Sequence, residues 1–361
     1  RDDTNAPKDC DFGGYRRARI SSQCLKRAIR TSSIFQNMLE GKLGVRTKKL
    51  VKCLSEGLQE YGLEPEKVQK VVSRFTNEYV GLESNGKTKV LLYLGADEIE
   101  KIVTTLKTNW DALLAAVNVE VDDKEKKSKK AQNDVFASLA KEVAKEAIGI
   151  TKAVDIALFG RMVAESPKDK VDGVIQMAHA FSTHRVNMEM DFFTAIDDIS
   201  NETGAEMMGT VEFNSACFYR YSLLDFQELL NNLQNDKELA LLTVEAFLRA
   251  AIEAIPSGKQ TSMAAQNLPS CVFAVVRKNS APQSLANAFE RPVYPDSKKG
   301  IVIQSIENID KYWGKLSRMY GQEGVLIRPI CLLDDAELEN LGDQVVNNIE
   351  QLIGNVKEAL A

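Results

Sequence analysis

Apolar residues recur along this chain with two different spacings, and the helical spacing dominates the first part. Spacings of three and four residues predict helices at 50–58, 68–75, 96–117 and 135–148. The apolar positions that set these spacings are Leu50, Val51, Leu54, Leu58, Val68, Val71, Val72, Phe75, Ile99, Ile102, Val103 and Leu106. One apolar stripe per helix predicts that residues 47–150 form a block of helices packed on one another.

Beyond residue 150 the spacing changes to two, which is typical of strands, and helical stretches lie between the strands. Strands are predicted at 154–158 (Val154, Ile156 and Leu158), 171–183, 209–223, 271–276 and 325–333. Helices are predicted at 237–254 and 306–319, and a last helix starts at Ala336. This order predicts an α+β core of ferredoxin-like type into which the helical block is inserted.

The most basic segment, residues 13–30, combines both spacings. In its first half arginines alternate with apolar residues, as in a strand with one solvent-exposed face. In its second half polar and basic residues follow a helical spacing behind two serines suited to an N-cap. The residues concerned are Arg16, Arg17, Arg19, Ser21, Ser22, Gln23, Lys26, Arg27 and Arg30. Guanidinium groups, hydroxyls and helix-terminal N–H groups bind phosphate oxygens, so the segment predicts a phosphate-binding surface. The alternative is a solvated basic face.

These basic residues stand out against an acidic chain. The 361 residues carry a net charge of −5, yet residues 1–52 hold 13 Lys or Arg against 5 Asp or Glu. A basic groove on an otherwise acidic body explains both values. Hydrophobic residues make up 44% and charged residues 27%, which is typical of a soluble globular protein. No apolar run reaches the roughly 20 residues that span a bilayer.

Candidate catalytic groups are few. His179 and His184 are the only histidines, and no GxSxG, P-loop or HExxH motif is present. Acidic residues near the start could bind a metal, but short acidic clusters among arginines are more often ion-pair partners. The members of this cluster are Asp2, Asp3, Asp9 and Asp11. Six scattered cysteines without a CxxC pair predict reduced thiols in a cytoplasmic protein, with neither zinc nor disulfides.

Residues 184–214 are too long for a hairpin turn and are rich in Met and Phe. Large apolar side chains (Val186, Met188, Met190 and Phe192) alternate with polar ones, and a polar loop follows. The pattern predicts either a protruding two-stranded arm or strands that fill the core. On an arm, such side chains could stack on bases or wedge between them. The charged stretch 122–130 has no apolar residue and predicts a solvated loop.

Several segments occur in the order known from one protein family: RDDTNAPKDCDFGGYRRARISSQCLKRAIR, VDIALFGRM, KVDGVIQMAHAFSTHRV, DFFTAIDD, GTVEFNSACFYRY and SLANAFE. In these segments the chain resembles the CasC backbone subunit of the type I-E CRISPR Cascade complex, an RNA-guided antiviral surveillance assembly of bacteria. The resemblance runs from the first residue to about residue 330 and is weakest in the helical block.

The resemblance implies a subunit shaped like a right hand. An RRM-like palm is expected at 1–30 and 151–361, helical fingers at 31–150, and a β-hairpin-like thumb at about 184–214. Copies are expected to polymerise along the guide RNA (crRNA), without catalysis or cofactor, and to present it for pairing with target DNA. The expected partners are crRNA, target DNA, other copies, and the other Cascade subunits, namely the large subunit, the small subunits and the subunits that bind the 5′ handle and the 3′ hairpin.

The resemblance also assigns roles to residues. crRNA binding is expected of Arg1, Arg17, Arg19, Ser21, Ser22, Gln23, Lys26, Arg27, Arg30, Arg161 and Met162. The thumb tip, expected to interrupt guide–target pairing, matches Phe192, Phe193 and Thr194. Target DNA contact is expected of Lys8, Lys298 and Lys299. The alternative function is an RRM-like CRISPR-associated ribonuclease that uses His179 or the cluster of Asp2, Asp3 and Asp9.

Overall fold

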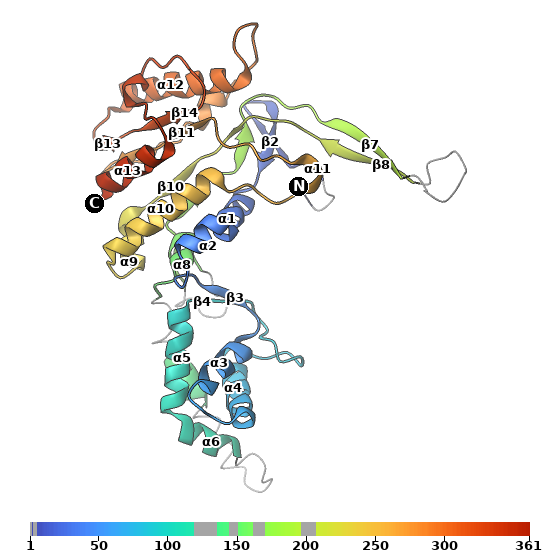
Figure 1. The fold of residues 1–361 in the computed structure, drawn as a ribbon, viewed down its shortest axis with the longest axis vertical. Helices are drawn as coiled ribbons and strands as arrows, with labels where there is room; N and C mark the ends of the chain where they lie inside the picture. The colour runs from blue at the N-terminus through green and yellow to red at the C-terminus, as the bar shows by residue number, and fades with distance from the viewer. Residues whose placement is uncertain (1, 3–5, 119–135, 144–150, 162–169, 196–206) are drawn as a thin grey trace. The chain divides into compact units, whose positions relative to one another are not determined.

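The computed structural model describes residues 2, 6–118, 136–143, 151–161, 170–195 and 207–361 (Figure 1). The chain divides into two compact units. Unit 1 consists of residues 1–35, 176–223 and 244–361, and unit 2 of residues 36–175 and 224–243. Each unit is therefore assembled from segments that are far apart in the sequence.

Unit 1 contains a four-stranded antiparallel sheet in the order β1-β2-β6-β9. Its strands are β1 (Asp9–Phe12), β2 (Tyr15–Ile20), β6 (Ala180–Ser182) and β9 (Phe218–Tyr219). Gly13 and Gly14 alone connect β1 to β2, and both have a positive φ, as a two-residue hairpin turn requires. A side chain at Gly13 would also collide with the backbone of Glu290. Only glycine fits there.

A long helix, α12 (Ile301–Tyr320), organises a second part of unit 1. Its Trp313 is buried and meets the ring of Phe273 edge-on at 5.2 Å. The accompanying elements are the antiparallel pairs β11 (Cys271–Phe273) with β14 (Ile330–Leu332) and β12 (Val276–Arg277) with β13 (Val325–Ile327), and helix α13 (Ile349–Leu360). Helix α13 packs on these strands.

The remaining elements belong to unit 1, to unit 2 or to segments of both. They are α1 (Ser22–Thr31), α2 (Ser33–Met38), β5 (Ile175–Met177), β7 (Glu189–Ala195), β8 (Met207–Phe213), β10 (Ser222–Leu224), α9 (Phe226–Asn232), α10 (Lys237–Glu253), α11 (Gln260–Met263), and the short 3₁₀ helices η3 (Ala286–Phe289) and η4 (Gly342–Gln344). Strand β5 pairs with β10. The predicted helix at 237–254 is confirmed as α10.

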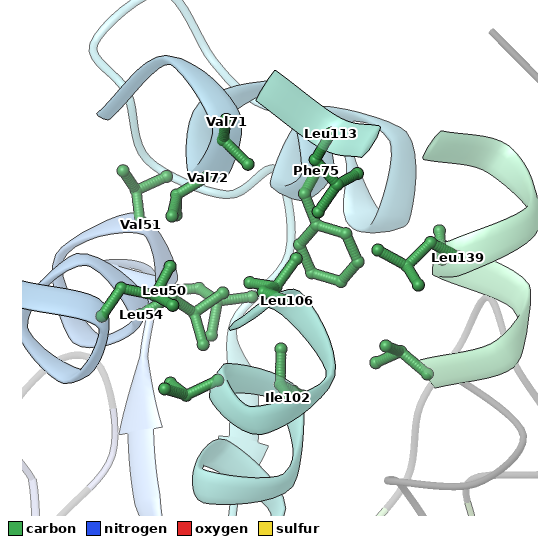
Figure 2. Packing of buried hydrophobic residues seen from close by; sticks show 14 of the residues in the cluster. Leu50, Val51, Leu54, Val71, Val72, Phe75, Ile102, Leu106, Leu113 and Leu139 are labelled. Carbon is green, nitrogen blue, oxygen red and sulfur yellow. The ribbon is translucent and has the colours of Figure 1, made fainter. Parts of the chain in front are cut away.

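Unit 2 contains the helical block predicted from the apolar spacing. Its helices are α3 (Leu50–Gln59), α4 (Pro65–Val80), α5 (Ala96–Thr108), α6 (Trp110–Asn118) and a helical stretch at 136–143. Figure 2 shows residues such as Leu54, Val72, Phe75 and Leu106 meeting in one core. Every residue of the first two predicted stripes is buried. The predicted loop at 122–130 lies outside the described residues.

Residues 154–158 form a helix, α8 (Val154–Phe159), and the predicted strand there is wrong. The whole segment is buried, including Asp155, whose carboxylate accepts a hydrogen bond from the Gly44 N–H at 2.7 Å. Because neighbours surround α8 on every side, its side-chain pattern carried no information about periodicity. The short ribbon of β3 (Val45–Thr47) and β4 (Leu92–Leu94) belongs to the same unit.

The C-terminal elements also differ from the prediction. The predicted strands at 271–276 and 325–333 are each split in two, and α12 starts five residues before the expected Ile306. No helix starts at Ala336, where the buried carboxylate of Asp310 instead accepts hydrogen bonds from the N–H groups of Glu339, Asn340 and Leu341. This side chain holds the backbone N–H groups in a non-helical turn.

The α+β class is confirmed. All three ladders of the main sheet are antiparallel, so the ferredoxin-like strand order stays a prediction, since that fold also needs a parallel pair. The assignment of palm, fingers and thumb also stays a prediction.

Candidate nucleic-acid interface

Strand β2 leads directly into helix α1, and the corner between them carries the basic residues of the N-terminal segment. Ser21 occupies the N-cap position in an extended conformation, although no side-chain hydrogen bond caps the helix. Leu25 and Ile29 are buried and fix the orientation of α1. The predicted helix and its start are confirmed.

The opposite side of α1 is more open. Gln23 and Arg27 are exposed, whereas Lys26 and Arg30 are half-buried. The first turn contains no acidic residue, so the partial positive charge of the helix amino end is not neutralised there. Burial lowers the pKa of the Lys26 amine, and a nearby anion would stabilise its charged form. This side of α1 therefore suits an anionic ligand.

The side chain of His179 contacts both strand β2 and helix α1 through hydrogen bonds. Its Nδ1 accepts a hydrogen bond from the Ser22 N–H at 3.3 Å and lies 3.2 Å from Nη1 of Arg19. Both neighbours are donors, which assigns Nδ1 as an acceptor and places the proton on Nε2. Arg19 also donates from Nε to the carbonyl of Asp9 at 3.0 Å. The guanidinium of Arg19 is thus held in one orientation at the corner.

A polar pocket of about 470 Å³ lies beside Arg19. Charged residues of both signs line it: Asp2, Lys8, Asp9, Arg16, Arg19 and Glu212. Arg16 forms an ion pair with Asp9, which confirms that an acidic residue of this cluster is an ion-pair partner. Asp3 lies outside the described residues.

Arg17 does not lie on an exposed face, and that expectation is wrong. Its guanidinium is buried and donates to the carbonyls of Ser182 (3.0 Å), Phe289 (2.7 Å) and Glu290 (3.2 Å). Burial lowers its pKa. Because the segment around residues 285–290 covers this face of the sheet, Arg17 binds the chain's own carbonyls and is not accessible to an RNA phosphate.

Aromatic side chains fill the same face of the sheet. Phe12 and Phe181 lie 4.7 Å apart, Tyr219 is 5.3 Å from the buried Phe289, and the Tyr219 hydroxyl accepts a hydrogen bond from Leu285 N–H. In many RNA-binding sheets such aromatic residues stack on bases. Here they pack against the segment at 285–290, so this face is closed to bases.

Strands β7 and β8 pair over seven residues and extend away from the sheet of unit 1 (Figure 1). Met190, Phe192 and Met208 lie on one face of this hairpin and are 60–74% exposed. Phe193 lies on the other face, over Gly209, where a Cβ would overlap its ring. The structure thus confirms the arm for Met190 and Phe192, whereas Val186, before β7, is buried as the core-filling alternative predicted. Thr194 is exposed and pairs with Met208.

His184 has a structural role at the base of this hairpin. Its Nε2 accepts a hydrogen bond from Cys217 N–H at 3.2 Å, and Nδ1 lies 2.8 Å from the carbonyl of Arg185, to which it donates. Both ring nitrogens are therefore engaged by the backbone.

Arg161, expected at the RNA, is instead buried in unit 2. Its Nη1 donates to both carboxylate oxygens of Glu98, at 2.7 and 3.0 Å, and to the carbonyl of Tyr93 at 3.0 Å. The side chains of Arg161 and Glu98 are 1% and 0% exposed. This arrangement gives Arg161 a structural role. Arg1 and Met162 lie outside the described residues.

The lysines expected at target DNA differ in environment. Lys298 is exposed and Lys8 half-buried. Lys299 forms ion pairs with Glu307 at 2.8 Å and Glu337 at 2.9 Å, and these carboxylates raise its pKa. Lys298 is the more accessible of the neighbouring pair.

Across the described residues, no three His, Cys, Asp or Glu side chains come together as metal ligands would. In the same part of the chain, no helix has the length and apolar character needed to cross a membrane. Sequence reasoning missed the roles of two residues. His179 accepts a hydrogen bond from Arg19, and Gly209 leaves room for the ring of Phe193. Neither had a sequence signal, since both depend on pairing between distant segments.

Comparison with protein families gives a match over nearly the whole chain. The family described as CT1975-like protein (Cas_CT1975) matches residues 1–356. The chain belongs to this family. A solved chain from a "CRISPR RNA-guided surveillance complex, pre-nicking" is similar, with 29% identity and a TM-score of 0.81, covering 100% of this chain and 95% of that one. A second, from a "CRISPR RNA-guided surveillance complex", has 26% identity and a TM-score of 0.72, covering 99% and 94%. Comparison with curated proteins gave no match.

Proposed function

We propose that this chain is a backbone subunit of a type I-E CRISPR surveillance complex. It holds the crRNA by its sugar–phosphate backbone and presents the bases to target DNA. Family membership over residues 1–356 and the likeness to chains of two such complexes support the proposal. Its other partners are further copies of itself, the large and small subunits, and the subunits at the 5′ and 3′ ends of the guide.

The corner between β2 and α1 is the observation that carries this proposal. Arg19 is fixed by His179, the amino end of α1 lacks an acidic residue, and Lys26, Arg27 and Arg30 follow along the helix. Donors of three kinds thus lie along one strand–helix corner, and phosphate oxygens accept from all of them.

Backbone binding, as opposed to base reading, follows from the closed face of the sheet. Because residues 285–290 cover Phe181 and Tyr219, bases cannot stack there. Specificity is then left to base pairing between guide and target, as in other RNA-guided complexes. The same subunit can therefore bind any guide sequence.

The β7–β8 hairpin supplies the part that touches the guide–target duplex. Phe192 and Met208 present apolar surface, whereas every charged residue of the two strands, Glu189, Asp191 and Glu212, is acidic. Acidic side chains repel phosphates, and apolar side chains wedge between bases. Lys8 and Lys298 are proposed to contact the target DNA.

The number of copies on guides of different length tests this proposal. With native mass spectrometry, we expect the complex to gain one protein mass of 40.1 kDa at regular increments of guide length. We also propose that the chain is not a nuclease, so guide and target RNA remain intact during incubation with magnesium. A single copy on every guide, or metal-dependent cleavage, would contradict the proposal.

His179 offers a test of how Arg19 is held. An asparagine places its side-chain oxygen near the position of Nδ1, whereas a glutamine places its own near Nε2. We therefore expect His179→Asn to keep the guide affinity of the unsubstituted chain and His179→Gln to weaken it several-fold, since only asparagine can accept from Ser22 N–H and face Arg19. Equal affinities for both variants in a fluorescence titration would show that Arg19 needs no such acceptor.

A further inference from the structure

A second basic surface lies in unit 2, on segments that the crRNA corner does not include. Residues 45–56 and 81–94 contain six cations and two carboxylates, Glu56 and Glu83. We call the cations the β3–β4 basic surface; they are Arg46, Lys48, Lys49, Lys52, Lys87 and Lys89. The surplus of four positive charges stands out in a chain of net charge −5.

Backbone contacts bring these two segments together. β3 pairs with β4, so that Arg46 lies opposite Tyr93. Just after the end of β3, the N–H of Thr88 donates a hydrogen bond to the carbonyl of Lys48 at 2.9 Å. The turn at 83–87 is closed by the hydrogen bond from Glu83 N–H to the Lys87 carbonyl at 2.8 Å. The cations are therefore neighbours in space within one unit.

Some of these charges stabilise the fold of unit 2. Lys48 pairs with Glu83 at 3.1 Å, Lys52 lies 3.6 Å from Glu56, and the Lys89 side chain lies over Gly81 at the carboxyl end of α4. Arg46, Lys49 and Lys87 are exposed, and among the described residues none of these three forms an ion pair. Ion pairing therefore does not explain these three charges, and the Arg46 guanidinium instead lies over the neutral ring of Tyr93 at 4.4 Å.

The position of Lys49 adds to the charge imbalance. Lys49 is the N-cap of α3, whose first turn contains no acidic residue and whose amino end has no side-chain cap. A cation is unfavourable at a helix amino end because the helix dipole is positive there. By contrast, α5 in the same unit carries Asp97 and Glu98 in its first turn. Lys49 is thus not placed for the stability of α3.

We propose that the β3–β4 basic surface binds the phosphodiester backbone of a nucleic acid, at a site separate from the β2–α1 corner. Five of its six cations are lysines, which are depleted at protein–protein interfaces but common at phosphate backbones. Tyr93 is the only aromatic residue in the two segments, and the guanidinium of Arg46 covers its ring at 4.4 Å. Bases cannot stack on a covered ring.

The surface therefore recognises charge and does not select a base sequence. Without a stacking platform, single strands have no advantage over duplexes. Duplex DNA, which has the higher charge density, is the strongest ligand expected. Such binding would hold DNA near the complex before any pairing with the guide.

Fluorescence anisotropy on the full chain, with duplex DNA, single-stranded DNA and RNA of unrelated sequence, tests this proposal. The variant is Arg46→Gln with Lys49→Gln and Lys87→Gln. If all three cations contact phosphates, the slope of log affinity against log salt concentration is less negative for the variant than for the unsubstituted chain. The difference is about 2.7 for duplex DNA and about 2.1 for single strands. Between about 50 and about 200 mM salt, the advantage of the unsubstituted chain on duplex DNA then shrinks about 40-fold.

The matched control is Lys70→Gln with Lys107→Gln and Lys141→Gln, which removes three exposed charges of unit 2 outside the surface. An equal change in the slope of log affinity against log salt for this triple variant and its control would overturn the proposal. Duplex binding that is unchanged in the Arg46, Lys49 and Lys87 variant would also overturn it, and would point to an acidic protein partner instead. If the triple variant has a lower melting temperature than the unsubstituted chain, the double variant Lys49→Gln with Lys87→Gln replaces it. The salt slope of this double variant for duplex DNA is expected to change by about 1.8. Lys26→Gln with Arg30→Gln is expected to weaken guide binding at the β2–α1 corner and to leave the contribution of the β3–β4 basic surface to duplex binding unchanged. The proposal for each site can therefore be refuted independently of the other.

Discussion

Replacing Arg161 with methionine is expected to destabilise unit 2 by about 3 to 5 kcal/mol. Its guanidinium contacts both carboxylate oxygens of Glu98, and the two side chains are only 1% and 0% exposed. Without Arg161, the Glu98 carboxylate would stay buried with no cation beside it. The loss is measured as a lower midpoint in urea unfolding followed by circular dichroism.

A second substitution separates the charge from the packing. Glu98 also accepts a hydrogen bond from Gly95 N–H at 2.8 Å, which caps helix α5. Glutamine at this position can still accept this bond but carries no charge. Arg161→Met with Glu98→Gln is therefore expected to recover most of the stability lost in Arg161→Met. A double variant no more stable than Arg161→Met would refute the role assigned to the buried charge.

The same variant tests the RNA role that the family resemblance implied for Arg161. Because its guanidinium is buried against Glu98 and Tyr93, no phosphate can reach it in this structure. Under conditions where Arg161→Met is folded, the salt dependence of guide binding is expected to equal that of the unsubstituted chain.

Sequence periodicity predicted the elements that have one buried face. Helices α3 and α4 follow their apolar stripes, with Leu54 and Phe75 fully buried, because solvent on the other side forces an amphipathic pattern. The pattern failed at α8, which is buried on all sides. It failed again after Ala336, where the carboxylate of Asp310, distant in sequence, accepts hydrogen bonds from the N–H groups of Glu339 and Leu341.

For the candidate site, sequence reasoning found the segment but not the role of each residue. The strand at Tyr15–Ile20 and the helix from Ser22 were predicted, and the exposed hairpin was one of two alternatives. Arg17 had the spacing of an exposed arginine, yet a segment about 270 residues away covers it. Only the tertiary structure shows which of two alternating arginines is accessible to solvent.

Removing two cations of α1 has the largest expected effect on RNA binding. Lys26→Gln with Arg30→Gln deletes two phosphate contacts of the proposed corner and keeps the length of the helix. Each lost contact reduces the salt slope for a single strand by about 0.7, so the double variant is expected to lose about 1.4. The reduction should be the same for every guide sequence, because the contacts are to phosphates.

The matched control removes one lysine and one arginine from another helix of unit 1. Lys315→Gln with Arg318→Gln alters two exposed residues of α12, at the same cost in net charge. This pair is expected to change the slope only slightly, because long-range charge effects are screened beyond about 8 Å at physiological salt. Equal melting temperatures of the two double variants would exclude unfolding as the cause.

The slope of log guide affinity against log salt, measured for these two double variants with two unrelated guide sequences, tests the central claim most directly. We expect Lys26→Gln with Arg30→Gln to flatten the slope by about 1.4 on both guides and the α12 pair to leave it nearly unchanged. Equal slopes for the two double variants, or a loss confined to one guide sequence, would contradict the proposal that this corner holds the RNA by its backbone.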